Sequence, residues 1–171
     1  MRQIARRVIK VALLFLLVSC TSVPYGPYSA GPHPLGEVKE WNMRLFPEPG
    51  RIELEAELQH GSDLVILLGA KNRDYIEPVR IVFSDEKCDT GHQIRVTYYV
   101  NRTEKLFKYF DTINVWGNDS LVTIEWDNDR RFSVTINGET MRAKTFVKFD
   151  SFEIKNEGGV KIKNLQYIKS V

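Results

Sequence analysis

The chain has 171 residues, of which 43% are hydrophobic and 27% charged, and 19 of them are aromatic. This composition supports one hydrophobic core and excludes a disordered chain, a collagen, a coiled coil and a multi-pass membrane protein. The first nineteen residues hold four basic side chains and no acid, so the chain from Cys20 onward carries 20 basic and 22 acidic residues, a net charge of −2. Without a basic surplus to neutralise phosphates, that body is not expected to bind nucleic acid.

The N-terminus has the pattern of a secretory signal. Residues Met1–Lys10 are basic, and Val11–Val18 is an unbroken run of eight apolar residues. A membrane-spanning helix needs ~20 such residues, so we interpret residues 1–19 as a signal peptide. Its end, Leu17-Val18-Ser19-Cys20, resembles the lipobox of bacterial lipoproteins. The alternative is a plain signal peptide that ends on a cysteine by chance.

The lipobox resemblance implies a lipid anchor on Cys20. In such proteins the peptidase cuts before a cysteine whose sulfur already carries diacylglycerol, and only the thiolate of a cysteine can accept that group. Three acyl chains, palmitate among them, give a stable anchor, whereas one chain binds a membrane only marginally. Lipoproteins retained at the inner membrane usually have Asp after the cysteine, and this chain has Thr21. The resemblance therefore implies a lipoprotein of the outer membrane, facing the periplasm or the cell exterior.

Cys88 is the other cysteine of the chain. An acylated Cys20 cannot pair with it, so the mature chain is expected to form no intramolecular disulfide. The segment around Cys88 is rich in turn-forming residues, which favours a structural position at a strand end. A catalytic thiol is the alternative, with His92 as its nearby base.

Residues 20–36 form the next segment, the lipidated cysteine and a tether. Within 21–36 lie four of the seven prolines and three of the eleven glycines. Proline removes the backbone donors that helices and sheets need, so an extended linker is expected, reaching ~50 Å at ~3.3 Å per residue. Residues 37–171 are interpreted as one domain.

That domain shows the two-residue period of β-strands. In Arg51–Leu58 four apolar residues alternate with three glutamates, which indicates a half-buried strand, and Asp63–Gly69 is the continuous apolar run of a sheet centre or of a strand covered on both faces. Hairpin turns are expected at Asp127–Arg130 and at Asn137-Gly138. Further strands are predicted at 79–83, 94–100, 105–110, 121–126, 131–136, 147–149, 152–155 and 160–168. Roughly ten short strands predict an all-β antiparallel sandwich or jelly roll.

Three segments resemble the concanavalin A-like lectin/glucanase superfamily, which includes laminin-G-like modules. Residues 121–140 (LVTIEWDNDRRFSVTINGET) carry an aliphatic strand ending in Trp-Asp and a strand ending in Asn-Gly-Glu, and 51–58 and 152–168 resemble an early and a closing strand of that fold. The resemblance implies a concanavalin A-like antiparallel β-sandwich. These motifs mark a fold and not an activity, because functions are grafted onto folds.

Glycan binding is the first function that the residues suggest. Aromatic faces cover the C–H surfaces of sugars, and planar polar groups bind their hydroxyls. In 93–100, Arg95 and Tyr99 share the face opposite the apolar residues, and Trp116 and Asn118 lie two residues apart in a loop. We take these four residues as candidate ligand contacts. The alternative for each is an ordinary structural role, since aromatic residues are favoured in strands.

Glycoside hydrolysis is the second hypothesis. Glu53, Glu55 and Glu57 lie on one face of one strand, and the resemblance links an E-x-D-x-E pattern to the catalytic acids of such glucanases, although the middle acid here is Glu. Alternate residues of a strand are ~6.6–6.8 Å apart, within reach of the ~5–9.5 Å that separates paired catalytic carboxyls. Glutamates on a solvated strand face are the alternative explanation.

A non-enzymatic envelope role, as an assembly lipoprotein that binds another protein, is the third hypothesis. No cofactor is expected, because no glycine-rich phosphate loop occurs. No metal is expected either, because the acidic pairs lack calcium-loop spacing and the three histidines lack zinc spacing. The sequence thus favours a lipid-anchored binding module with a carbohydrate ligand.

Overall fold

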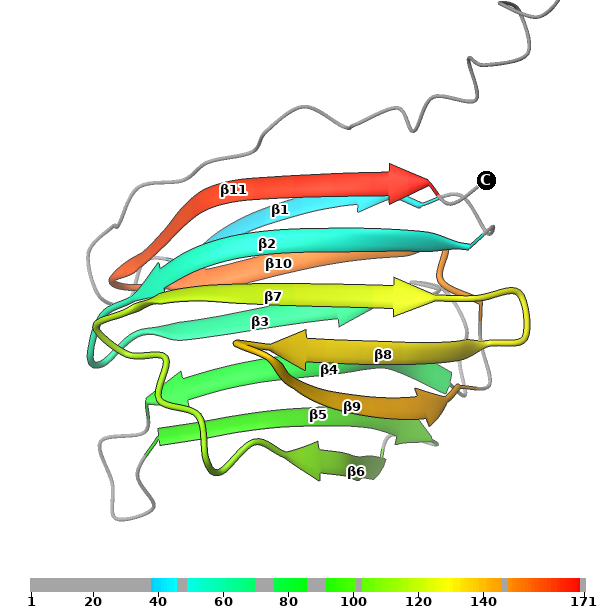
Figure 1. The fold of residues 1–171 in the computed structure, drawn as a ribbon, viewed down its shortest axis with the longest axis horizontal. Coiled ribbons are helices and arrows are strands. Elements are labelled where there is room, and N and C mark those ends of the chain that lie inside the picture. Colours follow the sequence, from blue (N-terminus) through cyan, green and yellow to red (C-terminus); the bar gives the residue numbers. More distant parts are fainter. Residues whose placement is uncertain are drawn as a thin grey trace, which may run out of the picture.

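A computed structural model describes residues 38–45, 49–69, 76–85, 92–100, 103–145 and 148–169. The predicted signal peptide, Cys20, the tether and Cys88 lie outside the described residues. The described part of the chain consists of eleven β-strands (Figure 1). They are β1 (Val38–Arg44), β2 (Gly50–Leu58), β3 (Asp63–Leu68), β4 (Ile76–Asp85), β5 (His92–Val100), β6 (Thr103–Tyr109), β7 (Asp119–Trp126), β8 (Arg131–Ile136), β9 (Glu139–Lys144), β10 (Ser151–Glu157) and β11 (Val160–Lys169).

The strands form two antiparallel sheets that pack face to face (Figure 1). One sheet has six strands in the order β1-β10-β3-β4-β5-β6, and the other has five in the order β11-β2-β7-β8-β9. Chain neighbours pair in β3–β6 and in β7–β9, whereas β10 inserts between β1 and β3, and β2 between β11 and β7. The predicted all-β antiparallel sandwich is therefore confirmed.

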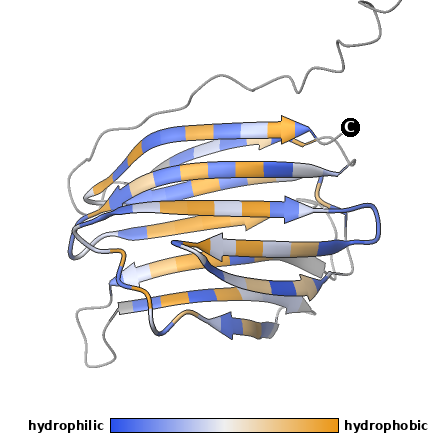
Figure 2. Cartoon of the chain, viewed as in Figure 1, coloured by the Kyte–Doolittle hydropathy of each residue, from blue (hydrophilic) through white to orange (hydrophobic). Residues whose placement is uncertain are grey.

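Alternation of apolar and polar residues determines which side of each strand is buried. In β2, Ile52, Leu54, Ala56 and Leu58 are buried, and the residues between them are half-buried. Successive side chains of a strand point to opposite faces, so one set enters the core and the other faces out. Figure 2 shows the same banding along most strands of both sheets. β3 lies between β10 and β4, as the continuous apolar run of this segment predicts for a sheet centre.

A chain of six aromatic rings crosses the interior between the sheets. Each ring meets the next with a centroid separation of 4.3–5.9 Å, in stacked or edge-to-face geometry. Such pairs add to the stabilisation that burial alone gives. The packing is tight at its end, where a Cβ on Gly50 would lie 2.6 Å from a ring carbon of Trp126. In order, the rings are Tyr98, Phe107, Phe132, Phe149, Trp126 and Tyr167.

The predicted hairpins join β7, β8 and β9. Asn137 and Gly138 have φ angles of 47° and 91°, the left-handed values that a two-residue turn of this kind requires. The side chain of Asn137 also accepts a hydrogen bond from the backbone N–H of Leu121 at 2.9 Å. In the other hairpin, Arg130 adopts φ 64° and closes the loop onto β8.

Three segments differ from the sequence prediction. β1 and β9 form strands where none was predicted, because both lie at sheet edges and their apolar periods are short. The strand predicted at 147–149 is wrong: of these residues, Lys148 and Phe149 lie in a segment without secondary structure. The apolar signal there comes from Phe149, which is 2% exposed because its ring belongs to the aromatic chain.

Candidate ligand-binding face

The candidate site is the outer face of β4, β5 and β6 in the six-stranded sheet. The register places Arg80 opposite Thr97, and Arg95 opposite both Val82 and Tyr109. These positions alternate with the core residues of the same strands, so their side chains share one outer surface. The sheet thus brings together two arginines, two tyrosines and a hydroxyl from segments up to 29 residues apart in the chain.

Arg80 and Tyr99 form the best-ordered contact of this face. The Nη1 of Arg80 donates a hydrogen bond to the Tyr99 hydroxyl at 2.6 Å, and the guanidinium carbon lies 5.3 Å from the centre of the Tyr99 ring. A guanidinium over an aromatic face is attracted by the ring electrons. The contact holds both groups in place without a carboxylate, so the positive charge of Arg80 is not neutralised by it.

Arg95 lies on the neighbouring strand and has weaker partners. Its Nη1 is 3.4 Å from the Gln93 side-chain oxygen, and its Nε is 3.9 Å from a carboxylate oxygen of Glu104. The Arg95 side chain is 28% exposed. Among the residues that the structure describes, Glu104 is the one acid that forms an ion pair with either arginine of this face.

Hydrogen-bonding capacity remains at the centre of the face. The Nε atoms of Arg80 and Arg95 and the hydroxyl of Thr97 are buried and have no hydrogen-bond partner within the described parts of the chain. Buried polar atoms in proteins are nearly always hydrogen-bonded, and an unsatisfied one costs about 1–3 kcal/mol. These three atoms have almost no accessible surface, so a ligand on the outer face could reach them only after the side chains shift.

At the other end of the same outer face, on β1 and β10, the cation is paired with acids. Lys155 of β10 lies 2.8 Å from Glu40 of β1 and 3.3 Å from Glu153. The hydrogen bond to Glu40, and then the contact with Glu153, raise the pKa of Lys155. The positive charge is therefore paired here, in contrast to Arg80.

The structure separates the four residues that were predicted as ligand contacts. Arg95 and Tyr99 lie on the same outer face, as the alternation in β5 indicates, and their binding role stays a prediction. Asn118 is exposed in the loop before β7 and donates a hydrogen bond to the Trp116 carbonyl at 3.3 Å. Trp116 itself is 2% exposed and belongs to the core, so the expectation of an indole displayed beside Asn118 is not met. The loop turns the indole inward because Gly117 donates its N–H to the Leu58 carbonyl at 2.7 Å, which pins the loop to the end of β2.

The three glutamates of β2 lie on the outer face of the other sheet. Arg51 binds Glu53, and Lys163 of β11 lies 3.4 Å from Glu57. Glu55 faces Leu121 on one neighbouring strand and Asn164 on the other. Two of the three carboxylates are therefore paired with cations of their own sheet, and a catalytic role for them stays a prediction.

Arg80 is the site residue that sequence reasoning missed. Its signal was present, since Val79, Ile81 and Phe83 alternate and are buried, which places Arg80 on the opposite face. What the sequence does not give is the neighbour, because only the register of β4 against β5 brings Arg80 to Thr97 and Tyr99.

The described residues contain no group of three or more histidine, cysteine or acidic side chains arranged to hold a metal ion. Within the same residues, no helix has the length and apolar character that crossing a membrane takes.

Comparison with known proteins relates this arrangement to solved structures. No family model and no curated protein matches the chain. The galectin LEC-6 of Caenorhabditis elegans superposes with a TM-score of 0.58 at 10% identity, covering 83% of this chain and 96% of that one. The CBM2 module of the evolved Dit protein of Lactobacillus casei BL23 phage J-1 gives 0.60 at 7%, covering 77% and 70%, and a Bacillus licheniformis β-glucanase gives 0.56 at 11%, covering 77% and 71%.

At these low sequence identities the similarity concerns the fold alone and does not identify the residues of a site. The two-sheet order, the antiparallel pairing in both sheets and the absence of helices from the described residues agree with that likeness. The chain is an antiparallel β-sandwich with the concanavalin A-like jelly-roll fold that galectins and β-glucanases share.

Proposed function

We propose that the chain is a non-enzymatic carbohydrate-binding module whose ligand lies on the outer face of β4, β5 and β6. The observation that carries this proposal is that Arg80 and Arg95, which have one acidic partner among the described residues, lie together on a face that also holds Tyr99 and Tyr109. Sugars need planar polar groups for their hydroxyls and an aromatic face for their C–H surface, and this face offers both. Galectins and a CBM2 module among the similar structures support the same class of ligand.

The anchor is part of the proposal. We propose that Cys20 is lipidated and attaches the module to the bacterial outer membrane, with residues 21–36 as the tether that holds it away from the lipid surface. The lipobox-like Leu17–Cys20 and Thr21 support this assignment. The substitution Cys20→Ala should leave the precursor uncleaved or release the protein from membranes. Normal processing and membrane retention of that variant would contradict the anchor and leave the ligand proposal standing.

The ligand proposal is tested by a glycan-array screen of the whole chain in detergent, followed by titration of the best ligand. Removing a charged hydrogen-bond donor costs about 1.5–3 kcal/mol, so Arg80→Gln and Arg95→Gln should each weaken binding about tenfold or more. Tyr99→Phe keeps the ring and should cost less than Tyr99→Ala. The matched control is Lys161→Gln, an exposed cation on the other sheet.

Two outcomes would overturn the proposal. One is a folded protein that binds no glycan on the array. The other is saturable binding that Arg80→Gln and Arg95→Gln leave unchanged, which would place the ligand elsewhere.

A protein partner is the second candidate, favoured by the edge strand β6. Leu106 and Tyr109 of this strand are 48% and 46% exposed, which is unusual for large apolar side chains beside an open sheet edge. A partner strand adding to β6 would cover both side chains. Leu106→Lys should abolish such binding in a pull-down from envelope extracts.

A further inference from the structure

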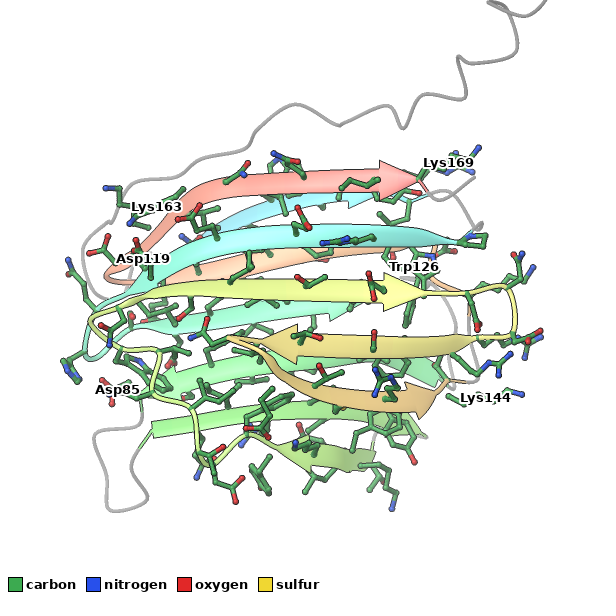
Figure 3. All side chains as sticks on the ribbon, in the orientation of Figure 1. Asp85, Asp119, Trp126, Lys144, Lys163 and Lys169 are labelled. Atoms are coloured by element: carbon green, nitrogen blue, oxygen red, sulfur yellow. The ribbon has the colours of Figure 1, made fainter. Side chains whose placement is uncertain are left out.

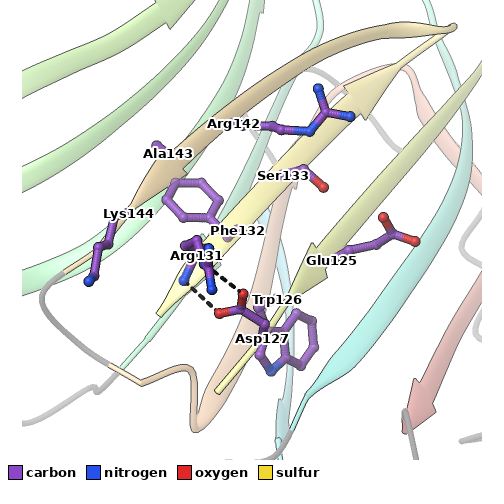
Figure 4. A pocket seen from close by; sticks show the side chains of 9 residues that line it. All are labelled: Glu125, Trp126, Asp127, Arg131, Phe132, Ser133, Arg142, Ala143 and Lys144. Atoms are coloured by element: carbon purple, nitrogen blue, oxygen red, sulfur yellow. Dashed lines mark hydrogen bonds and ion pairs between the residues drawn. The ribbon is translucent and has the colours of Figure 1, made fainter. Parts of the chain in front are cut away.

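The five-stranded sheet carries a separate open cavity over β7, β8 and β9 (Figure 4). Its volume is about 620 Å³, within the ~300–1,000 Å³ of small-molecule sites. It lies on the other sheet from the face of Arg80 and Tyr99, so neither site shares a residue with the other.

Register explains why the surface is hollow at this point. Ser133 of β8 lies opposite Glu125 of β7 on one side and opposite Arg142 of β9 on the other. All three side chains point away from the core, and serine is much the shortest, so it forms a floor between two long walls (Figure 4). Trp126 and Phe132 also line the cavity, but their side chains face the core and are 7% and 3% exposed.

The acids that line the cavity are already paired. Glu125 lies 3.6 Å from Arg51 of β2. Asp127 accepts a hydrogen bond from the Arg131 side chain at 3.0 Å, and Arg131 also binds Asp129. The backbone hydrogen bonds from Arg131 and Asp129, together with the charge of Arg131, lower the pKa of Asp127 despite an opposing effect of burial. Both carboxylates are thus paired with arginines.

The remaining cations of the cavity are not paired. Within the described residues, Arg142 and Lys144 of β9 have no acidic partner, and both are exposed. The register also places Lys144 directly opposite Arg131. Arg131 is already paired with Asp127 and Asp129, so the charge left for an anionic ligand is that of Arg142 and Lys144.

We propose that this cavity is a second binding site, for a saccharide that carries a carboxylate or sulfate group. Arg142 and Lys144 bind the anionic group, Arg142 through the two parallel hydrogen bonds that a guanidinium offers an oxyanion. Ser133 and the outward oxygen atoms of Glu125 bind ring hydroxyls.

The test is a titration of the whole chain in detergent with glucuronate, glucose 6-sulfate and neutral glucose, followed by ¹H–¹⁵N chemical shifts. The acidic sugars should bind at least tenfold more tightly than glucose. The double variant Arg142→Gln/Lys144→Gln should weaken acidic-sugar binding at least tenfold, and added salt should weaken it further. Lys161→Gln, a cation on the same sheet outside the cavity, should bind as the wild type does.

A second variant keeps the charges and fills the space. Ser133→Tyr suits a strand and would occupy the floor of the cavity, so it should abolish binding while the protein stays folded. Arg80→Gln should leave this binding unchanged, which separates it from the proposed function.

Three results would overturn the inference. They are equal affinity for glucose and glucuronate, binding lost with Arg80→Gln but kept in the cavity variants, and competition by inorganic sulfate at the same concentration as the sugar. The last would show an anion site without recognition of a sugar.

Discussion

Two regions of the sandwich's outer surface, β2, β7 and β11 on one sheet and β4 and β5 on the other, differ in how their cations are paired. On β2, β7 and β11 of the five-stranded sheet, cations and acids alternate across the strands: Lys163 contacts both Glu57 and Asp119, and Arg51 contacts Glu53. Figure 3 shows Lys163 and Asp119 together at one end of this face. On β4 and β5 of the six-stranded sheet, Arg80 is held by a tyrosine and has no acidic partner among the described residues.

This difference separates charges that serve the fold from charges that remain for a ligand. Exposed ion pairs contribute little to stability, but they neutralise the charges of the surface that carries them. A cation that has no acidic partner among the described residues can instead bind a polar ligand. The comparison therefore points to β4–β6, and on the other sheet to Arg142 and Lys144, as the places where a polar ligand gains most.

The largest expected effect tests the boundary between core and face. Trp116→Ala should lower the free energy of unfolding by about 3–5 kcal/mol, because it removes a 2% exposed indole from the core. Tyr99→Phe, on the face, should lower it by about 1 kcal/mol, the net value of one hydrogen bond. Chemical denaturation measures both. Equal small losses would mean that Trp116 is not a core residue.

A smaller effect tests the turn that sets the register of β8 against β9. Asn137→Ala should cost about 1–2 kcal/mol, because alanine is strained at φ 47° and cannot accept the hydrogen bond from Leu121. Asn137→Gly should recover the conformational part of this loss and not the hydrogen bond. If the glycine variant were as unstable as the alanine variant, backbone strain would not be the cause.

The difference between the two faces can be tested directly by replacing one cation on each and comparing the melting temperatures. Asp119 and Glu57 raise the pKa of Lys163, so Lys163→Gln should lower the melting temperature slightly because both acids lose their cation. Arg80→Gln should change the melting temperature less, because the hydrogen bond to Tyr99 that it loses is offset by the buried Nε without an acceptor that it removes. The comparison fails if the arginine variant is the less stable of the two.

The smallest effect concerns the ion pair that links the sheets. Lys108 of β6 and Thr112 hydrogen-bond to Glu139 of β9 and lower the pKa of its carboxyl below the ordinary value of 4.5. A depressed carboxyl pKa stabilises the folded state above the unfolded-state pKa, and this contribution is lost as the pH falls through the folded-state pKa. Glu139→Gln should therefore flatten the loss of stability below about pH 4.5. An unchanged pH profile of the melting temperature would contradict the assignment.

Much of the fold was predictable because it depends on local alternation. The two-residue period of Arg51–Leu58 gave the strand and its buried side, and the period of β5 placed Arg95 and Tyr99 on one face. Alternation does not apply in loops, so the inward turn of Trp116 depended on a hydrogen bond to Leu58 from a distant part of the chain. Strand order could not be predicted either, since the insertion of β10 between β1 and β3 does not change the residue pattern of any single strand. Both sites depend on that cross-strand register, which is why only half of the first could be anticipated.

Because Trp126 belongs to the chain of aromatic rings, ligand binding can be followed by the intrinsic fluorescence of the protein. Trp126 ends one side of the cavity over β7–β9 and stacks on Tyr167 in the core, with ring planes 4° apart. Trp116 is buried, and Trp41 lies on β1, four strands from β5 in its sheet. A ligand in the cavity will therefore change tryptophan emission through Trp126, whereas a ligand beside Tyr99 will leave it almost constant. The wavelength and intensity of tryptophan emission thus indicate which of the two sheets has bound a sugar.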